Sequence, residues 1–204
     1  MHTEILNKNQ VELLPVISLF KRSFYLVGGT AIALHLGHRR SIDFDLFTFS
    51  SLNKTRIKAV LRETNYEQIP VFEDIDQLHL VINKVKMTFF NFPYKVEHKV
   101  KFENTITFPS LLDLAAMKAF ALGRRSKWKD YVDLYFIIKD HFTINEISQK
   151  ADNIFPNQFS EKLFRQQLAF HKDIDFTEQV EYIIEPVDEE IIKNFLIERA
   201  IDIM

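Results

Sequence analysis

The chain has no cysteine, which excludes disulfides and thiolate chemistry. It has no internal repeat and no low-complexity tract, and its 204 residues contain only 4 glycines. No signal peptide and no apolar run of about 18 residues is found, so neither secretion nor membrane spanning is expected. We therefore expect a cytoplasmic protein without a membrane partner.

The residues that are present suit one compact enzyme with an uneven charge. Hydrophobic residues make up 47% of the chain, which is enough for a real core, and 20 residues are phenylalanine. The net charge of −2 conceals an asymmetry. Residues 140–204 contain 14 acidic and 6 basic residues, a charge of −8, which leaves +6 on residues 1–139. A basic segment of this kind favours a polyanionic partner such as a triphosphate or RNA.

Two of the four glycines are adjacent, Gly28 and Gly29, between an apolar segment over residues 24–27 and a predicted short helix over residues 30–36. Bare backbone approaches phosphate closely, and a helix that begins after a glycine turn offers free N–H groups to an anion. Thr30 either positions a phosphate through its hydroxyl or caps the helix. We therefore interpret this segment as a phosphate-binding turn.

Two carboxylates follow in an alternating segment, Ser41 to Phe47, which predicts a half-buried strand. Ser41, Asp43 and Asp45 would share one face, with Cα atoms of neighbouring Asp roughly 6.6 Å apart, so both can reach one divalent cation. Together with Gly28-Gly29 they indicate a site for a metal-bound nucleoside triphosphate. Arg39 and Arg40 precede the strand, and either could steer an acceptor.

This pattern resembles the DNA polymerase β-like nucleotidyltransferases, whose signature is hydrophobic-Gly-Gly, a short gap, and Asp-hydrophobic-Asp-hydrophobic. The fuller string from Val27 to Phe47, VGGTAIALHLGHRRSIDFDLF, is similar to the AbiEii/AbiGii group of abortive-infection and toxin–antitoxin nucleotidyltransferases. The resemblance covers about residues 20–140. It implies an NTP substrate, with Mg²⁺ or Mn²⁺ on Asp43 and Asp45. The existence of a cognate antitoxin stays open at this point, and the acidic C-terminal segment is the candidate docking surface for one.

A second block agrees with the resemblance. Lys118 lies on a predicted helix, a basic stretch follows, and Asp130 and Asp133 then stand in an Asp-x-x-Asp-Leu motif. Lys118 either extends its stem over apolar neighbours or reaches the triphosphate as a fixed positive charge, and the resemblance favours the second interpretation. Asp130 and Asp133 share a helix face, and they either hold Lys118 or arginines in place or pair with Lys127 and Lys129.

One feature departs from the superfamily, which usually has a third carboxylate on a strand beside the Asp-x-Asp strand. The candidate strand here, residues 85–92, contains no acid, and Thr88 stands near the vacant position. The general base is therefore open: Asp130 or Asp133 substitutes, or the acceptor proton goes to solvent or to a triphosphate oxygen.

The expected fold class is α+β, with a nucleotidyltransferase-type mixed sheet and flanking helices followed by an all-helical part. We predict two domains, residues 1–108 and 109–204. Strands are expected over 66–73, 77–82 and 85–92, with a tight turn at Asn83-Lys84. Predicted helices are 8–21, 51–65, 110–123, 127–140, 143–152, 160–171 and 188–203.

Three functions compete at this point. The first, which the resemblance implies, is a toxin that adds a nucleotide to RNA, with the tRNA 3′ end as the acceptor. The second is nucleotidylation of a protein hydroxyl. The third is a degenerate module that binds nucleotide or a partner without chemistry, as the missing third carboxylate would suggest.

Overall fold

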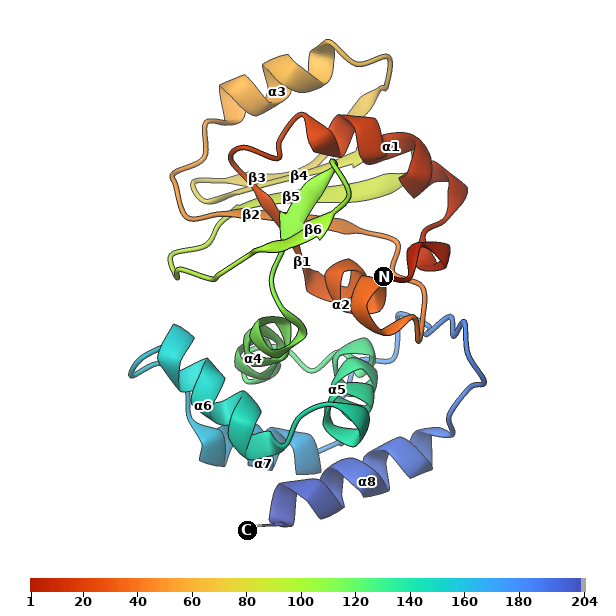
Figure 1. Cartoon of the computed structure of the whole chain (residues 1–204), viewed down its shortest axis with the longest axis vertical. Helices are drawn as coiled ribbons and strands as arrows, with labels where there is room; N and C mark the ends of the chain where they lie inside the picture. The colour runs from red at the N-terminus through yellow and green to blue at the C-terminus, as the bar shows by residue number, and fades with distance from the viewer. Residues whose placement is uncertain (203–204) are drawn as a thin grey trace.

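The computed structural model describes residues 1–202 and arranges them as a mixed sheet beside a group of helices (Figure 1). A small hairpin follows the sheet, and α4 (Leu111–Leu122) then carries the chain into the helical half. One hydrophobic core runs through both halves. The predicted α+β class with C-terminal helices is therefore confirmed, whereas the division into two domains at residues 108 and 109 stays a prediction.

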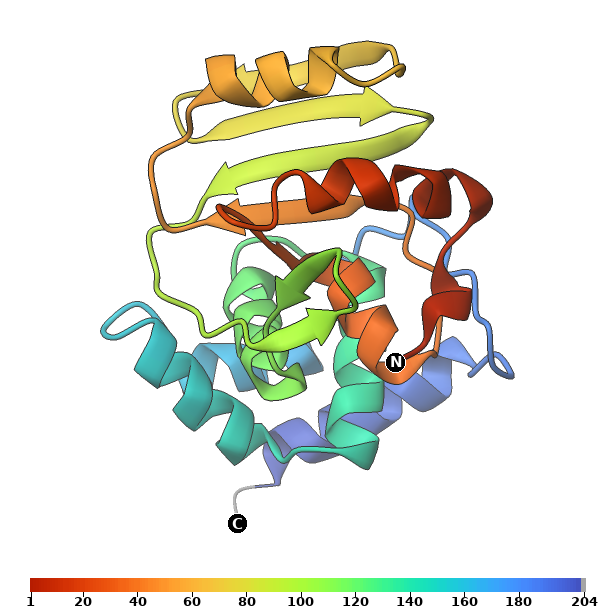
Figure 2. The ribbon, with the colours of Figure 1, turned by 45° about the horizontal axis from the view of Figure 1, so that its top comes forward.

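The main sheet has five strands in the order β1-β2-β5-β4-β3. β2 and β5 are parallel and the other neighbours are antiparallel, which makes the sheet mixed. Figure 2 shows these strands side by side, with α1 (Lys8–Ser18) running across them and α2 beneath. The strands are β1 (Tyr25–Val27), β2 (Phe44–Thr48), β3 (Gln68–Asp74), β4 (Gln77–Ile82) and β5 (Val85–Asn91).

The β4–β5 hairpin sets the register on which the site depends. Its turn residues, Asn83 and Lys84, have positive φ values of 49° and 63°, as the two-residue turns that match strand twist require. β5 then pairs with β2 so that Asp45 lies opposite Thr88, and Thr88 in turn lies opposite His79 on β4. Directly paired residues share a face of a sheet, so these three side chains form one row.

The helix after the glycines begins earlier than predicted. α2 (Gly28–Leu36) starts at Gly28 rather than at Thr30, and its cap position is Val27, which has no side-chain cap. The interpretation of Thr30 as the helix cap is therefore wrong. The helix ends at Gly37, which has the left-handed conformation (φ 68°) typical of a helix terminus.

The second motif strand begins later than predicted, at Phe44 rather than at Ser41. The backbone carbonyls before Phe44 accept hydrogen bonds from side chains outside the sheet. The carbonyl of Ser41 accepts a hydrogen bond from the Gln10 side chain at 2.7 Å, and the carbonyl of Asp43 accepts one from the Thr30 hydroxyl. Ser41 and Asp43 therefore lie on a loop that leads into the strand, and the expectation that both share its face with Asp45 is wrong.

The helix α3 (Lys54–Arg62) is shorter than the predicted helix over residues 51–65. Its cap is Asn53, whose side chain accepts a hydrogen bond from the backbone N–H of Arg56. The predicted start at residue 51 is therefore too early, because residues 51–53 precede the helix.

The helical half follows the predicted pattern. Ser110 caps α4 by accepting from the N–H of Asp113, as its sequence motif indicates. The helices that follow have ends within about two residues of the prediction, and residue 203 of the last predicted helix lies outside the described residues. They are α5 (Trp128–Asp140), α6 (Ile144–Ile154), α7 (Glu161–Ala169) and α8 (Glu189–Ile201).

Three short elements were not predicted, because three-residue segments carry too little periodicity. They are η1 (Thr3–Ile5), β6 (Val100–Phe102) and β7 (Ile106–Phe108). β6 and β7 pair with each other in a separate two-stranded sheet that lies close to β1. Within residues 1–202 no helix combines the length and the apolar character needed to cross a bilayer.

Candidate active site

The glycine turn brings bare backbone against a carboxylate. Gly28 has φ +73°, and a Cβ built on it would lie 2.2 Å from Oδ2 of Asp45. A Cβ on Gly29 would lie 2.8 Å from a guanidinium nitrogen of Arg39 and 2.9 Å from the Ser41 hydroxyl. Neither position has room for a side chain, so the two glycines allow the N-terminus of α2 to approach the carboxylate loop.

Asp45 is half-buried on β2, in the middle of this arrangement. Burial raises the pKa of its carboxyl, although the charge of Arg125 and a hydrogen bond from Thr88 partly offset that effect. Asp45 therefore stands in a weakly compensated environment beside the free N–H groups of a helix terminus.

Asp43 lies on the loop before β2, and its backbone is fixed by the buried hydroxyl of Thr30. Burial, and then the neighbouring charge of Asp45, raise the pKa of its carboxyl. Two half-buried carboxylates that repel each other suit a divalent cation, which would relieve both the burial cost and the repulsion. In residues 1–202 no group of three or more His, Asp or Glu is arranged to hold a metal, so a cation here would rely on these two and on substrate oxygens.

Lys118 lies on α4 with only 6% of its surface exposed, and its ammonium is held by two carboxylates. Nζ is 2.7 Å from Oδ1 of Asp130 and 2.7 Å from Oδ2 of Asp133, both on α5. Asp130 also pairs with Arg125 at 3.1 Å. The structure thus selects one of the two alternatives for the aspartates: they hold Lys118, whereas Lys127 pairs with Glu178.

Asp133 is the centre of this buried network. Arg39 donates two hydrogen bonds to it, from Nε at 2.7 Å and from Nη2 at 2.8 Å, and His38 Nε2 lies 2.7 Å from its Oδ1. Burial alone would raise the pKa of Asp133, but the charges of Arg39 and Lys118 outweigh it and hold the pKa well below its usual range. A carboxylate so stabilised in its charged form is a poor proton acceptor.

Asp130 has the same character, because Lys118 and Arg125 outweigh burial and lower the pKa of its carboxyl. Arg40, in contrast, points away from the network. Its Nε lies 2.7 Å from Glu181, and its backbone N–H donates to the carbonyl of the same residue. The segment around Glu181, which precedes α8, therefore holds in place the loop that carries Arg39 and Arg40.

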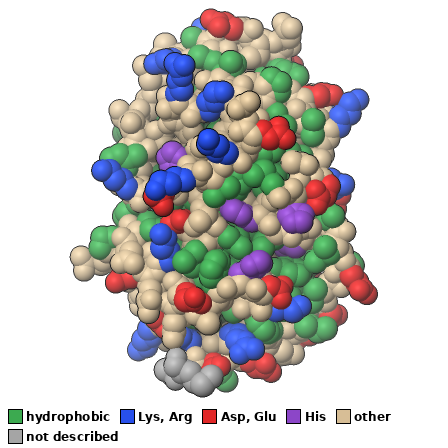
Figure 3. Space-filling view, in the orientation of Figure 1, with side chains coloured by type: hydrophobic (Ala, Val, Ile, Leu, Met, Phe, Trp, Pro, Cys, Tyr) green, Lys and Arg blue, Asp and Glu red, His purple; other side chains and the backbone are tan. Residues whose placement is uncertain are grey.

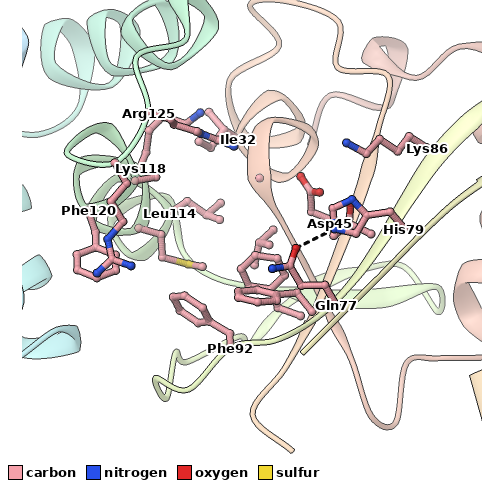
Figure 4. Close-up of a pocket in the computed structure, with 18 residues that line it drawn as sticks. Ile32, Asp45, Gln77, His79, Lys86, Phe92, Leu114, Lys118, Phe120 and Arg125 are labelled. Atoms are coloured by element: carbon pink, nitrogen blue, oxygen red, sulfur yellow. Dashed lines mark hydrogen bonds between the residues drawn. The ribbon is translucent and has the colours of Figure 1, made fainter. Parts of the chain in front are cut away.

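A cavity of about 400 Å³ connects these groups. Figure 4 shows Asp45, His79 and Lys86 on the sheet side, opposite Lys118 and Arg125 on the helical side. Gly28 and Thr88 also line it, and Gln77 hydrogen-bonds His79 at its edge. Asp43, Arg39 and Arg40 stand outside the lining. The cavity thus combines exposed glycine backbone, one carboxylate of the pair and several cations.

Aromatic side chains form another part of the cavity wall. Phe47 and Phe90 lie opposite each other on β2 and β5, with ring centroids 5.0 Å apart, and Phe92 follows them. Phe120 faces them from α4 and carries the Arg124 guanidinium 4.1 Å above its ring centre. The wall is therefore apolar and aromatic, with the Phe120 ring already stacked on Phe155 at 3.9 Å.

Residues 13–103 and 93–200 match the family described as nucleotidyl transferase AbiEii toxin, type IV toxin–antitoxin system. The chain belongs to the AbiEii nucleotidyltransferase toxin family. Membership makes it a nucleotidyltransferase-type toxin and implies an NTP substrate and, typically, a divalent metal. The resemblance stated from Val27 to Phe47 is therefore confirmed.

Three known proteins are similar to this chain, one in sequence and two in fold. Protein aq_aa25 of Aquifex aeolicus is 31% identical over 201 residues, which span 93% of this chain and 94% of that protein. The structure of MenT4, a nucleotidyltransferase toxin from Mycobacterium tuberculosis, superposes with a TM-score of 0.65 at 12% identity, covering 95% of this chain and 82% of that one. JHP933 from Helicobacter pylori gives 0.56 at 17% identity, with coverages of 96% and 91%. The two structural matches support the nucleotidyltransferase-like fold.

Sequence reasoning missed the sheet side of the cavity. Gln77, His79 and Lys86 fall on predicted strands, but the sequence pattern indicates no role for them or for the aromatic wall. The predicted turn at Asn83-Lys84 already carried the missing signal, because a two-residue turn there pairs residue 79 with residue 88. Trp128 is buried in the core, His35 bonds to the carbonyl of Pro109, and His38 bonds to Asp133.

Proposed function

We propose that this protein transfers a nucleoside monophosphate from an NTP to a hydroxyl at the 3′ end of an RNA, with tRNA as the acceptor. The observation that carries the proposal is the cavity in which Gly28 backbone, the Asp45 carboxylate and the Lys118 ammonium meet. The glycine backbone and the Lys118 ammonium would bind the triphosphate, and the Asp45 carboxylate would hold the metal that activates the phosphorus.

The glycine turn would hold the β- and γ-phosphates. Gly28 and Gly29 open α2, so their N–H groups would bond to phosphate oxygens, and neither residue has a side chain of its own in the way. The Ser41 hydroxyl, which borders Gly29, supplies one more donor. On the opposite side of the cavity, Lys118 has a third N–H besides the two directed at carboxylates, and this one would bond to the leaving pyrophosphate.

Asp43 and Asp45 would hold the metal, Mg²⁺ or Mn²⁺. Burial raises the pKa values of both carboxyls, and the charge of Asp45 adds to the rise at Asp43, so a hard cation with oxygen ligands would relieve the cost of two charged carboxylates here. Bound there, the metal would neutralise triphosphate charge and polarise the α-phosphate. The protein's own contribution is to hold the two carboxylates close to the phosphate-binding turn.

Asp130 and Asp133 would act as positioning residues. They fix Lys118 from α5, and Asp133 at the same time fixes Arg39, whose guanidinium borders Gly29. One carboxylate therefore orients both the cation of the helical half and the loop that carries the metal ligands. Arg40, held by Glu181, remains one-third exposed and is available to an acceptor.

Charge supports RNA as the acceptor. Arg124 and Arg125 stand exposed at the cavity mouth, inside a segment that has five bases and no acid between Lys118 and Lys129. Residues 1–139 carry +6, and Figure 3 shows several Lys and Arg side chains gathered over the sheet half on the face it presents. A cognate antitoxin, which membership in the family implies, would dock on the oppositely charged residues 140–204.

The test is incorporation of each α-³²P-labelled NTP with Mg²⁺, using purified tRNA and a protein extract as separate acceptors. The proposal expects label on tRNA, and the labelled triphosphate names the preferred base. Label on protein alone would replace RNA by a protein hydroxyl. Label on neither, from folded protein, would indicate a binding module without chemistry.

A further inference from the structure

Where the superfamily places its third carboxylate, the described strand β5 has Thr88, and a histidine stands one strand further along the same row. Asp45, Thr88 and His79 pair successively across β2, β5 and β4. Residues paired in this way project from one face of the sheet, and all three line the cavity. Two strand spacings separate Asp45 from His79, about 10 Å between backbones.

The space above Thr88 therefore lies between a carboxylate and an imidazole. Each of these side chains extends into the cavity from its own strand, as Figure 4 shows. A hydroxyl bound over Thr88 would face Asp45 on one side and His79 on the other. Proton transfer needs only that the hydroxyl oxygen come within about 3 Å of a bare ring nitrogen.

The ring of His79 is oriented by its neighbour on the same strand. Its Nε2 lies 3.0 Å from Oε1 of Gln77, and an amide oxygen can only accept, so Nε2 carries the proton and donates it. Nδ1 is then unprotonated, and no other group in residues 1–202 bonds to it. Phe72 from β3 supports the ring, with 5.4 Å between ring centres.

The surroundings keep this imidazole neutral. Burial and then the charge of Lys86 lower the pKa of His79, which favours the neutral ring. The charged groups that share the cavity with it are Asp45 on β2, Lys86 on β5, Lys118 on α4, and Arg124 and Arg125 in the turn after α4. With four cations and one carboxylate among them, this set disfavours protonation.

We propose that His79 is the general base that activates the acceptor hydroxyl, in place of the absent third carboxylate. The proposal rests on the nucleotidyl transfer proposed above. Nδ1 accepts the proton of the hydroxyl as its oxygen forms a bond to the α-phosphorus. The bond from that phosphorus to the oxygen bridging the β-phosphate breaks, pyrophosphate leaves with the electron pair, and the imidazolium later releases its proton to solvent.

The test uses the full chain with Mg²⁺, tRNA and the preferred NTP. Transfer is measured in single turnover for the wild type, for His79→Ala and His79→Gln, and for His141→Ala as a control in the exposed turn after α5. NTP affinity is measured in parallel by equilibrium dialysis. Removing a general base lowers the rate by about 10²–10⁴-fold. We expect that loss in both His79 variants with NTP affinity unchanged, and no loss in the control.

Two further readouts separate a base from a structural residue. Added imidazole should restore part of the rate to His79→Ala but not to His79→Gln, which fills the space. The wild-type rate should rise with pH through a pKa below 6.5 and then level off, and this step should vanish in His79→Ala. Wild-type transfer with full activity in both His79 variants would overturn this inference and leave the proposed function standing. No transfer by folded wild type would overturn both.

Discussion

The backbone of Gly28 lies so close to the Asp45 carboxylate that a methyl group on Gly28 would stand 2.2 Å from Oδ2. The contact joins the phosphate-binding turn to one of the proposed metal ligands. Neither the turn nor the Asp45 carboxylate can therefore shift without displacing the other.

Gly28→Ala should therefore abolish transfer and lower the melting temperature. The left-handed φ of +73° costs a non-glycine residue about 1–2 kcal/mol, and the new methyl must also displace Asp45. The matched control is Gly123→Ala, because its nearest contact would be 3.9 Å away and its φ is unstrained. Thermal melts and transfer rates of the two variants are compared. Equal activity in both would contradict the assigned role of the turn.

Asp133→Asn should destabilise the fold strongly. The substitution removes the charge that faces Arg39 and Lys118, so that buried Arg39 loses its ion-pair partner and Lys118 keeps only Asp130. Breaking a buried pair in this way costs about 3–5 kcal/mol. Urea unfolding measures the change, with exposed Glu181→Gln as a control that should cost under about 1 kcal/mol. A small effect at Asp133 would show that the network contributes little to folding.

Low pH should destabilise the fold through protonation of Asp133. The folded-state pKa of Asp133 is depressed well below its unfolded value. Its stabilising contribution is therefore complete above about pH 4 and is lost as the pH falls through the folded pKa. In acid titrations followed by circular dichroism, the wild type should lose stability steeply below pH 4. Asp133→Asn should start less stable and show a flatter dependence, and parallel curves would contradict this assignment.

Asp43→Asn should stabilise the metal-free protein at pH 7 while abolishing the response to metal. The folded-state pKa values of Asp43 and Asp45 are raised, so their charges oppose folding once the pH exceeds those values. Removing one charge removes the repulsion. Mg²⁺ should raise the melting temperature of the wild type by mass action but leave the variant unmoved. An equal Mg²⁺ response in both proteins would place the cation elsewhere.

The sequence predicted the site where a pattern is local, and missed it where the geometry depends on distant segments. Gly28-Gly29 and Asp45 could be identified because the turn and the strand lie close in the chain. Asp43 was placed on a strand because alternation gives no sign that Gln10 and Thr30 bond to the loop.

The same limit applies to the partners of Lys118 and to the cavity wall. The sequence showed that Asp130 and Asp133 share a helix face, but only the packing of α4 against α5 shows that they face Lys118. His79 joins the site through the register of three strands. The hairpin turn fixes the pairing of β4 with β5, whereas the pairing of β5 with β2 forms only in the folded sheet.

The proposed function requires that Asp45 support nucleotide addition to RNA. Mass spectrometry of tRNA 3′-terminal fragments, after incubation with NTPs and Mg²⁺, tests this requirement most directly, with Asp45→Asn as the comparison. We expect fragments heavier by whole nucleoside monophosphates with the wild type, and unmodified termini with the variant. Equal extension by both proteins, or unmodified termini with folded wild type, would contradict it.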